Sequence, residues 1–292
     1  MTREIRHLVV IGTGLIGGSV ALALRRAGCV GRITGVGRSA ENLQLAVDLG
    51  VIDDFSHDVA QVVADADMVL VSVPVSASAD VFRAMAQNLP ADAVITDAGS
   101  SKQSVMAAAA EYLPNPSRFV PAHPIAGTEE SGAGAAFAEL FDRHWCILTP
   151  DEATDADALA RVRSLWEATG SRVMQMDAAA HDEHLAAVSH LPHVAAFALV
   201  NAVRKSGGDD PFRFAAGGFR DFTRIASSSP EMWRDIAMCN REALIAKLDA
   251  LITELGVLRA AVDGGDADCL LTEFAAARAA RDAWLLKYGD EL

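Results

Sequence analysis

The sequence predicts an α/β fold in two parts. A doubly wound parallel sheet with helices on both faces is expected over residues 1–177, and an all-helical domain over residues 178–292. In the first half, short apolar runs alternate with helical patterns, as in successive βαβ units. After about Asp177 no convincing strand-like run remains. A glycine-rich turn after the first predicted strand is a third indication of this fold class.

Six apolar runs in the first half are expected to be strands, because continuous apolar runs are typical of strands covered on both faces. They are Leu8–Ile11, Arg32–Val36, Met68–Val73, Ala93–Asp97, Phe119–Ala122 and Trp145–Thr149. Helical patterns lie between them, for example over Leu15–Ala27 and Ser76–Asn88. In the second half we predict helices over Val188–Val203, Arg241–Val262 and Leu270–Leu286, and a loop over Gly207–Asp210.

One predicted helix of the second half carries an apolar seam with spacings that alternate between four and three. The seam consists of Leu244, Leu248, Leu251, Leu255, Leu258 and Val262. Such a pattern packs either into an internal core or against a partner helix. A helical domain this small buries little surface alone, which favours a homodimer interface.

Composition and charge restrict the partners. The 292-residue chain has a formal net charge of −14, which repels nucleic acid and anionic membranes, so we expect neither. No apolar run approaches the ~18 residues of a membrane helix. The start, Met1–Glu4, leaves no room for a secretory signal before the first predicted strand. The four cysteines are scattered without CxxC spacing, as expected of reduced thiols in the cytoplasm. An anionic substrate would need local cations at its site.

The glycine-rich turn predicts a dinucleotide site of the Rossmann type. Its residues are Gly12, Thr13, Gly14, Leu15, Ile16 and Gly17, which form the pattern GxGxxG. The glycines permit a tight turn and let the backbone approach a pyrophosphate, whose charge the helix N-terminus stabilises. A plain tight turn is the alternative. The position of this turn in the first βαβ unit favours the nucleotide.

The end of the second predicted strand bears on the choice between NAD and NADP. An acidic residue that binds the ribose 2′-hydroxyl is expected about 20 positions after the glycines. Gly37 occupies that place, and Arg38 and Ser39 follow it. These two residues suit a 2′-phosphate, so the sequence favours NADP. The alternative is that Arg38 is a solvated surface residue and that NAD is bound through other contacts.

Two further strand ends carry polar residues suited to catalysis. Asp97–Lys102 follows one predicted strand, and His123–Glu129 follows the next. Ligands of an open α/β sheet bind at the carboxyl ends of its strands. Hydride transfer from an alcohol requires a base on the hydroxyl, and His123 is suited to that role near neutral pH.

The helical half contributes three polar clusters: His181–His184, Ser189–His193, and Gly217–Arg224 with Trp233 and Arg234 beyond it. A kinked, capped helix or a metal site are alternatives for the histidines. We expect no metal, because neither a cysteine nor an HExxH pattern accompanies them. Arginines in the third cluster are suited to bind a carboxylate, with solvated surface residues as the alternative.

Together these segments resemble the prephenate and arogenate dehydrogenase family. The matching segments are Gly12–Ser19 (GTGLIGGS), Asp97–Lys102 (DAGSSK), His123–Gly132 (HPIAGTEESG), Ser189–His193 (SHLPH) and Gly217–Ile225 (GGFRDFTRI), with Trp233 beyond. They occur in the family's order and span nearly the whole chain. The resemblance implies a Rossmann-like domain followed by a helical dimerisation domain.

The resemblance also implies roles for individual residues. His123 would take the proton of the substrate's ring hydroxyl, Ser100 would position that hydroxyl and the nicotinamide, and Arg224 would bind a substrate carboxylate. The residues that would line or adjoin the pocket are Thr128, Ser189, His190, His193, Asp221 and Trp233. The implied reaction is oxidative decarboxylation of prephenate to 4-hydroxyphenylpyruvate, or of arogenate to tyrosine, with hydride transfer to NAD(P).

Two other functions are compatible with a nucleotide fingerprint. A two-domain dehydrogenase for another hydroxy acid would use a lysine in the helix that opens its second domain, but Ala178–Asn201 contains none. A non-enzymatic NAD(P) sensor would carry the fingerprint without the ordered set of Ser100, His123 and Arg224.

Overall fold

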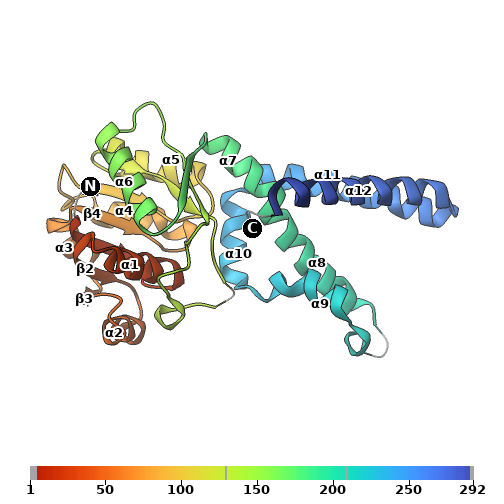
Figure 1. Ribbon diagram of the computed structural model, residues 1–292, viewed down its shortest axis with the longest axis horizontal. Helices are drawn as coiled ribbons and strands as arrows, with labels where there is room; N and C mark the ends of the chain where they lie inside the picture. The colour runs from red at the N-terminus through yellow and green to blue at the C-terminus, as the bar shows by residue number, and fades with distance from the viewer. Residues whose placement is uncertain (1–4, 129, 208–209, 290–292) are drawn as a thin grey trace. The chain divides into compact units, whose positions relative to one another are not determined.

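The computed structural model describes residues 5–128, 130–207 and 210–289 (Figure 1). By its internal contacts the chain forms two compact units, divided between Arg241 and Glu242. All described strands lie in the first unit, and the last of them ends at Gln175. The start Met1–Glu4, on which the expected lack of a secretory signal depended, is outside the described residues, as is Glu129.

A six-stranded, fully parallel sheet forms the centre of the first unit, which confirms the predicted fold class. Its strand order is β3-β2-β1-β4-β5-β6. The strands are β1 (Ile5–Ile11), β2 (Val30–Val36), β3 (Asp54–Ser56), β4 (Met68–Val71), β5 (Val94–Asp97) and β6 (Phe119–Val120). The order reverses between β1 and β4, and ligands of such sheets bind outside the carboxyl ends at this switch point.

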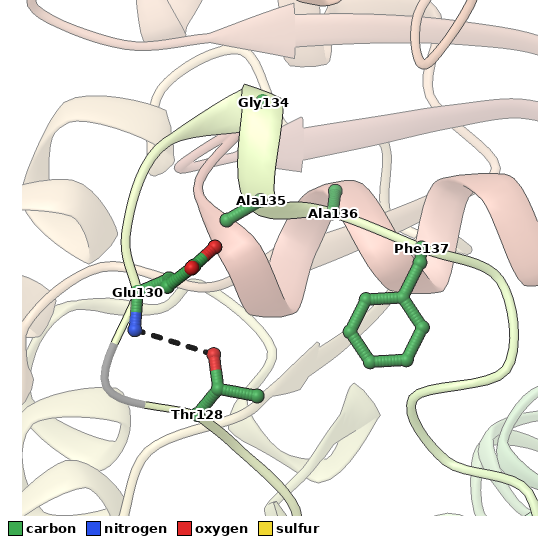
Figure 2. Close-up of a pocket in the computed structure, with 6 residues that line it drawn as sticks. All are labelled: Thr128, Glu130, Gly134, Ala135, Ala136 and Phe137. Carbon is green, nitrogen blue, oxygen red and sulfur yellow. Dashed lines mark hydrogen bonds between the residues drawn. The ribbon is translucent and has the colours of Figure 1, made fainter.

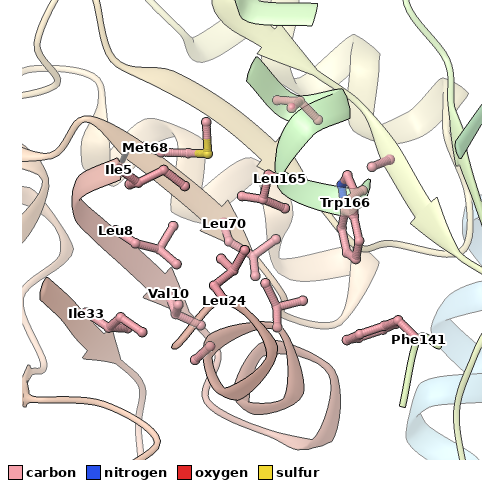
Figure 3. Packing of buried hydrophobic residues seen from close by; sticks show 14 of the residues in the cluster. Ile5, Leu8, Val10, Leu24, Ile33, Met68, Leu70, Phe141, Leu165 and Trp166 are labelled. Atoms are coloured by element: carbon pink, nitrogen blue, oxygen red, sulfur yellow. The ribbon is translucent and has the colours of Figure 1, made fainter. Parts of the chain in front are cut away.

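Helices cover both faces of this sheet (Figure 1). They are α1 (Leu15–Ala27), α2 (Ala40–Asp48), α3 (Val59–Val62), α4 (Ser78–Met85), α5 (Gln103–Tyr112) and α6 (Ala156–Ala168), with 3₁₀ turns η1 (Val63–Asp65), η2 (Val75–Ala77), η3 (Pro116–Arg118) and η4 (Ala133–Ala135). Alternate side chains of β1 point to opposite faces. Leu8 and Val10 join the core that holds Leu24 of α1 and Trp166 of α6 (Figure 3). Burial on both faces explains why the central strands β1, β4 and β5 are largely apolar.

The predicted strand Phe119–Ala122 is wrong as a single element. The chain turns at Pro121, which has no N–H to continue a ladder. β6 ends before it in the main sheet, and β7 (Ala122–Pro124) begins a second sheet with β8 (Trp145–Leu148) and β9 (Arg172–Gln175). His123 therefore lies within β7 rather than in the loop after a strand.

The remaining differences from the predicted elements are smaller. The strand predicted to reach Val73 ends at Val71, and the helix predicted over Ser76–Asn88 divides into η2 and α4. β3 and β9 were not predicted, because they are short, polar and only partly buried, so they lack the apolar signature of the other strands.

One long helical stretch follows the strands. It comprises α7 (Ala178–Leu185), a π-helical turn η5 (Ala186–His190) and α8 (Leu191–Lys205). The helix predicted from Val188 thus begins ten residues earlier than expected. The π turn directly precedes the segment that contains Pro192, whose missing N–H removes one helical hydrogen bond. Such turns are frequent at functional sites.

By length and composition alone, Ala178–Lys205 would also suffice to cross a membrane, since an 18-residue window within it has a mean hydropathy of 1.4. The search for unbroken apolar runs in the sequence missed this stretch, because polar residues such as Asp182 and His190 interrupt it. Core helices of soluble proteins meet the same criterion, so the observation is weak evidence for a membrane helix.

The chain then continues through short helical elements to a pair of long helices. The short elements are η6 (Pro211–Phe214), α9 (Gly217–Thr223), η7 (Arg224–Ser227) and α10 (Pro230–Cys239). The long helices are α11 (Arg241–Gly264) and α12 (Ala267–Tyr288), which agree with the predicted ones. Of the predicted loop at 207–210, Gly208 and Asp209 are outside the described residues. In the apolar seam of α11, Leu255 and Val262 are 55% and 67% exposed.

Candidate active site

The glycine turn after β1 is fixed by two close backbone approaches. Gly12 has a φ of +100°, and a Cβ on it would lie 2.2 Å from the carbonyl oxygen of Ser72, just after β4. A Cβ on Gly17 would lie 2.2 Å from the carbonyl oxygen of Gly12. Neither position accepts a side chain, which explains two of the three glycines in the pattern.

The third glycine faces open space. No atom lies within 4 Å of the position of a Cβ on Gly14, among the neighbours that the structure describes. Gly14 precedes α1, and no side chain caps this helix end. The first N–H groups of α1 are therefore available to an anion, as a dinucleotide pyrophosphate requires. Leu15 is buried, Ile16 packs against the core, and Thr13 is held by Asn42, which donates to its carbonyl oxygen and hydroxyl at 3.1 and 3.2 Å.

The residues expected to choose the cofactor lie at the end of β2. Ser39 caps α2, with its hydroxyl accepting a hydrogen bond from the amide of Asn42 at 3.1 Å. The carbonyl oxygen of Gly37 lies 2.7 Å from Nδ1 of His57, a residue that sequence reasoning did not consider. Arg38 is exposed. No carboxylate stands at Gly37 to repel a 2′-phosphate.

A buried ion pair ties the end of β5 to the start of β7. Lys102 Nζ donates to Asp97 at 2.5 Å and to the carbonyl oxygen of Ala122 at 2.7 Å. The other carboxylate oxygen of Asp97 accepts the amide of Ala122 at 2.9 Å. Lys102 is 0% exposed, so this charge is fully desolvated and must be paired. The clamp fixes the backbone directly before His123.

His123 connects β7 to the helical stretch. Its Nδ1 lies 2.8 Å from Nε2 of His181, and Nδ1 of His181 lies 2.8 Å from the Asp182 carboxylate. Among the described residues, Nε2 of His123 has no hydrogen-bond partner. Burial and the nearby His181, Lys102 and His190 hold the pKa of His123 well below its usual range, so the ring is neutral near pH 7.

His190 approaches the same site from the π turn. The side-chain nitrogen of Asn240 donates to the carbonyl oxygen of Asp182 at 2.7 Å and lies 3.1 Å from Nδ1 of His190. A carbonyl only accepts, so this atom of Asn240 is the amide nitrogen, and His190 must accept at Nδ1 and carry its proton on Nε2. That buried Nε2 has no partner among the described residues. The backbone of Ser100 lies near His190, and burial lowers the pKa of His190 to about 4.

His193 is held from two sides. Its Nδ1 lies 2.9 Å from the carbonyl oxygen of Ser189, and its ring stacks on Trp233. Burial, opposed by the hydrogen bond to Ser189 and aided by the charge of Arg224, lowers the pKa of His193. Arg224 itself is exposed at the start of η7. Ser189, Trp233 and Arg224, all predicted from the sequence, therefore lie around His193, and Trp233 also meets His190.

Two predicted site residues lie apart from this cluster. Thr128 is exposed on the loop after β7 and lines a separate pocket with Glu130 and Gly134 to Phe137 (Figure 2). This loop adjoins the nucleotide turn, since the amide of Ala133 donates to Asn42 at 2.8 Å. Asp221 is exposed on α9 and pairs with Arg220 at 3.3 Å.

Sequence reasoning assigned no role to Lys102, His181, Asp182 or Asn240. Two signals were present in the chain: a lysine inside the Asp97–Lys102 motif, and the His-Asp pair within the His181–His184 cluster. Neither pattern reveals its partner, because the contacts between His181 and His123 and between Asp182 and Lys102 join positions 58 and 80 residues apart.

Both halves of the chain match models of one protein family. Residues 20–175 match the nucleotide-binding domain of prephenate dehydrogenase, and residues 177–276 match the dimerization domain of prephenate dehydrogenase. The second match is to a dimerization domain, in agreement with the dimer that the apolar seam predicted.

Individual relatives agree with these matches. The chain is 42% identical to cyclohexadienyl dehydrogenase of Zymomonas mobilis, over 94% of this chain and 95% of the relative. It is 38% identical to prephenate dehydrogenase of Bacillus subtilis, over 96% of this chain and 76% of the relative. The crystal structure of Aquifex aeolicus prephenate dehydrogenase, in complex with hydroxyphenyl propionate and NAD+, superposes with a TM-score of 0.91 at 35% identity and covers 97% of this chain and 99% of that one. The chain belongs to the prephenate dehydrogenase family.

Proposed function

We propose that this protein oxidatively decarboxylates prephenate, arogenate or both, with hydride transfer to NAD or NADP, as a step of tyrosine biosynthesis. The observation that carries the proposal is the neutral His123, whose Nε2 lacks a protein partner among the described residues. It lies in β7 of the second sheet, and the hydrogen bond from the amide of Ala122 to Asp97 ties β7 to the carboxyl end of β5, in the sheet that also bears the glycine turn. Membership of the prephenate dehydrogenase family supports the same reaction.

His123 is proposed as the base. Its Nε2 accepts the proton of the ring hydroxyl while the hydride leaves the ring carbon that bears this hydroxyl. After CO2 has left, His123 returns the proton to the phenolate oxygen. The electron pair of the broken carbon–carboxylate bond completes the aromatic ring. Because the proton is returned, the residue ends the cycle neutral, as it began. Ser100, whose backbone lies near His190, is proposed to position the hydroxyl.

The carboxylates of the substrate require local positive charge, since the chain carries a net charge of −14. Arg224 is proposed to bind one of them. The protonated Nε2 of His190 and the ring of His193 are proposed to hold the other end of the substrate, with Ser189, Trp233, Thr128 and Asp221 around them. A neutral His190 donates a hydrogen bond without adding a charge.

The nucleotide fits the open end of α1, with Gly14 against the pyrophosphate. When bound, NAD(P) accepts the hydride. Gly12, Thr13, Leu15, Ile16 and Gly17 shape this turn. We propose that Arg38 and Ser39 favour NADP, because a cation and a hydroxyl follow Gly37 where NAD-specific sites carry a carboxylate.

The helical domain is proposed to start after Asp177 and to form a homodimer through the seam of α11. The change of family model between residues 175 and 177 and the exposed Leu255 and Val262 support this arrangement. We propose a cytoplasmic enzyme that binds neither membrane nor nucleic acid. The membrane-length stretch carries His181, Asp182 and His190 in buried positions, as expected of a helix that serves a polar site.

A steady-state assay of both substrates with both cofactors tests the proposal. Absorbance at 340 nm reports reduced cofactor directly. We expect turnover with prephenate, arogenate or both, and a higher kcat/KM with NADP than with NAD. An Arg38→Ala variant should lose the advantage of NADP and keep its rate with NAD. Absence of reduced cofactor in all four combinations would exclude the proposed reaction and favour an NAD(P) sensor.

A further inference from the structure

We propose that His181 and Asp182 are positioning residues that hold the single proton of the neutral His123 ring on Nδ1, so that Nε2 presents a lone pair to the substrate. This inference rests on the proposed function for its chemical purpose. Its geometry is independent of that function. It is carried by the continuous chain of contacts from Asp182 to His181 and from His181 to His123, each 2.8 Å long.

The donors and acceptors along these contacts can be assigned from Asp182 onward. Its carboxylate accepts the amide of Lys102 at 2.7 Å and the amide of Gln103 at 2.9 Å. Burial opposes ionisation, but the hydrogen bonds from His181 and from these two amides hold the pKa of Asp182 below its usual value. The side chain is therefore an ionised carboxylate, which can only accept.

The proton positions of the two histidines follow from this carboxylate. His181 must carry a proton on Nδ1 in order to donate to Asp182. With its ring proton on Nδ1, His181 accepts at Nε2, and the atom that faces it, Nδ1 of His123, donates. His123 is the Nδ1–H tautomer, and its Nε2 is left unprotonated. Both nitrogens of the fully buried His181 are used in this way.

The surroundings favour the neutral form of His123. His123 is faced by Lys102 from the loop before α5, by His181 from α7, by His190 from the π turn and by Cys146 from β8. A second positive charge beside Lys102 is disfavoured in this desolvated position. When His123 takes the substrate proton, the cation formed hydrogen-bonds through His181 to the negative Asp182, which offsets part of that cost.

This arrangement has the logic of the Ser-His-Asp triad, with a second imidazole placed between the carboxylate and the base. In that triad, loss of the correct tautomer costs about 10⁴ in kcat although the geometry is retained. We therefore expect the effect of His181 on kcat to be large. Its effect on substrate binding should be small, because it does not reach the substrate.

Two substitutions of His181 separate its role as a hydrogen-bond acceptor from its role in packing. In His181→Gln the side-chain oxygen can still accept from Nδ1 of His123, whereas His181→Phe fills the space without an acceptor. We expect kcat to fall at least ~10²-fold in His181→Phe and to recover to within ~10-fold of wild type in His181→Gln, with KM for the substrate and Kd for the cofactor changed less than ~3-fold in both. Equal losses in the two variants, or full activity of the phenylalanine variant, would overturn the inference.

The tautomer of His123 can also be measured in the substrate-free protein, independently of activity. Selective ¹⁵N-histidine labelling distinguishes protonated from unprotonated ring nitrogens, and His123→Asn and His181→Gln assign the two rings. At pH 7.5 we expect Nδ1–H with an unprotonated Nε2 on His123. The opposite tautomer would overturn the inference even if the enzyme turned over prephenate. The expected tautomer would stand even if neither substrate reacted, which separates this inference from the proposed function.

Discussion

Trp233 stacks on His193, with ring centroids 3.5 Å apart and ring planes inclined by 18°. The two rings come from α10 and α8, and the edge of His190 meets the same indole at a centroid distance of 6.1 Å. Nε1 of Trp233 is buried and has no partner among the described residues. One indole thus orients two of the histidines that are proposed to line the substrate pocket.

Loss of this stack should weaken substrate binding. Aromatic pairs contribute about 0.5–1.5 kcal/mol beyond their buried area, which corresponds to roughly a 2- to 10-fold change in an equilibrium constant. We expect Trp233→Leu to raise KM for the substrate by about 10-fold and Trp233→Phe, which keeps a stacking ring, to raise it less. Steady-state kinetics checks this. A larger effect from phenylalanine than from leucine would show that stacking is not the cause.

Removal of the proposed carboxylate-binding cation should act mainly through KM. Hydrogen bonds to charged groups contribute about 1.5–3 kcal/mol, so Arg224→Ala should raise KM by roughly 10- to 100-fold. Arg163→Ala is the matched control, since Arg163 pairs with Glu167 on α6. An unchanged KM in Arg224→Ala would rule out the carboxylate role.

The glycine turn predicts two distinct outcomes for two alanine substitutions. In Gly14→Ala the methyl group enters open space, so we expect an unchanged Tm and a Kd for NAD(P) raised at least ~10-fold, because the backbone can no longer approach the pyrophosphate. In Gly17→Ala the methyl group meets the Gly12 carbonyl, which should lower stability by about 1–3 kcal/mol. Calorimetry and thermal unfolding measure the two effects. Equal cofactor affinity in Gly14→Ala and wild type would contradict the proposed pyrophosphate position.

The buried histidines predict a loss of stability in acid. Burial lowers the pKa of His190 to about 4 in the folded protein, from an ordinary value of about 6.5. Between these values the unfolded chain binds a proton that the folded protein does not, so stability falls as the pH decreases from 6.5 toward 4, by about 1.4 kcal/mol per unit for one group. His123 and His193 have lowered pKa values and add to the same trend.

Denaturant unfolding between pH 7 and 4.5 measures this slope. His190→Gln should flatten it by up to one proton's contribution, because the substituted residue does not titrate. A slope equal to that of wild type would show that His190 is not held neutral in the folded protein.

The sequence predicted those features that depend on local pattern. Gly12 and Gly14 indicate a tight turn, because a predicted strand precedes them and a predicted helix follows. The segments β1, β2 and α1 were predicted because each is largely apolar or amphipathic. His123 was expected in the loop after a strand of the main sheet, and it lies instead within β7 of the second sheet.

The features that sequence reasoning missed depend on tertiary partners. Asp182 is ionised because the amides of Lys102 and Gln103, at the start of α5, donate hydrogen bonds to it. Lys102 can be buried because Asp97 and the Ala122 carbonyl oxygen accept hydrogen bonds from its ammonium group. The π turn at Ala186–His190 directs His190 toward Asn240, a residue 50 positions away. No local periodicity encodes such contacts. The polar residues of these clusters could therefore be predicted as site candidates, but their contact partners could not.

The most direct test of the account is the turnover number of His123→Asn. The side-chain amide of asparagine can still donate to His181, so the packing is largely kept while the base is removed. We expect kcat to fall by ~10²- to 10⁴-fold with Kd for NAD(P) within about 2-fold of wild type, and His184→Asn, at an exposed histidine of α7, to retain full activity. A His123→Asn enzyme with a near-wild-type kcat would contradict the proposed base.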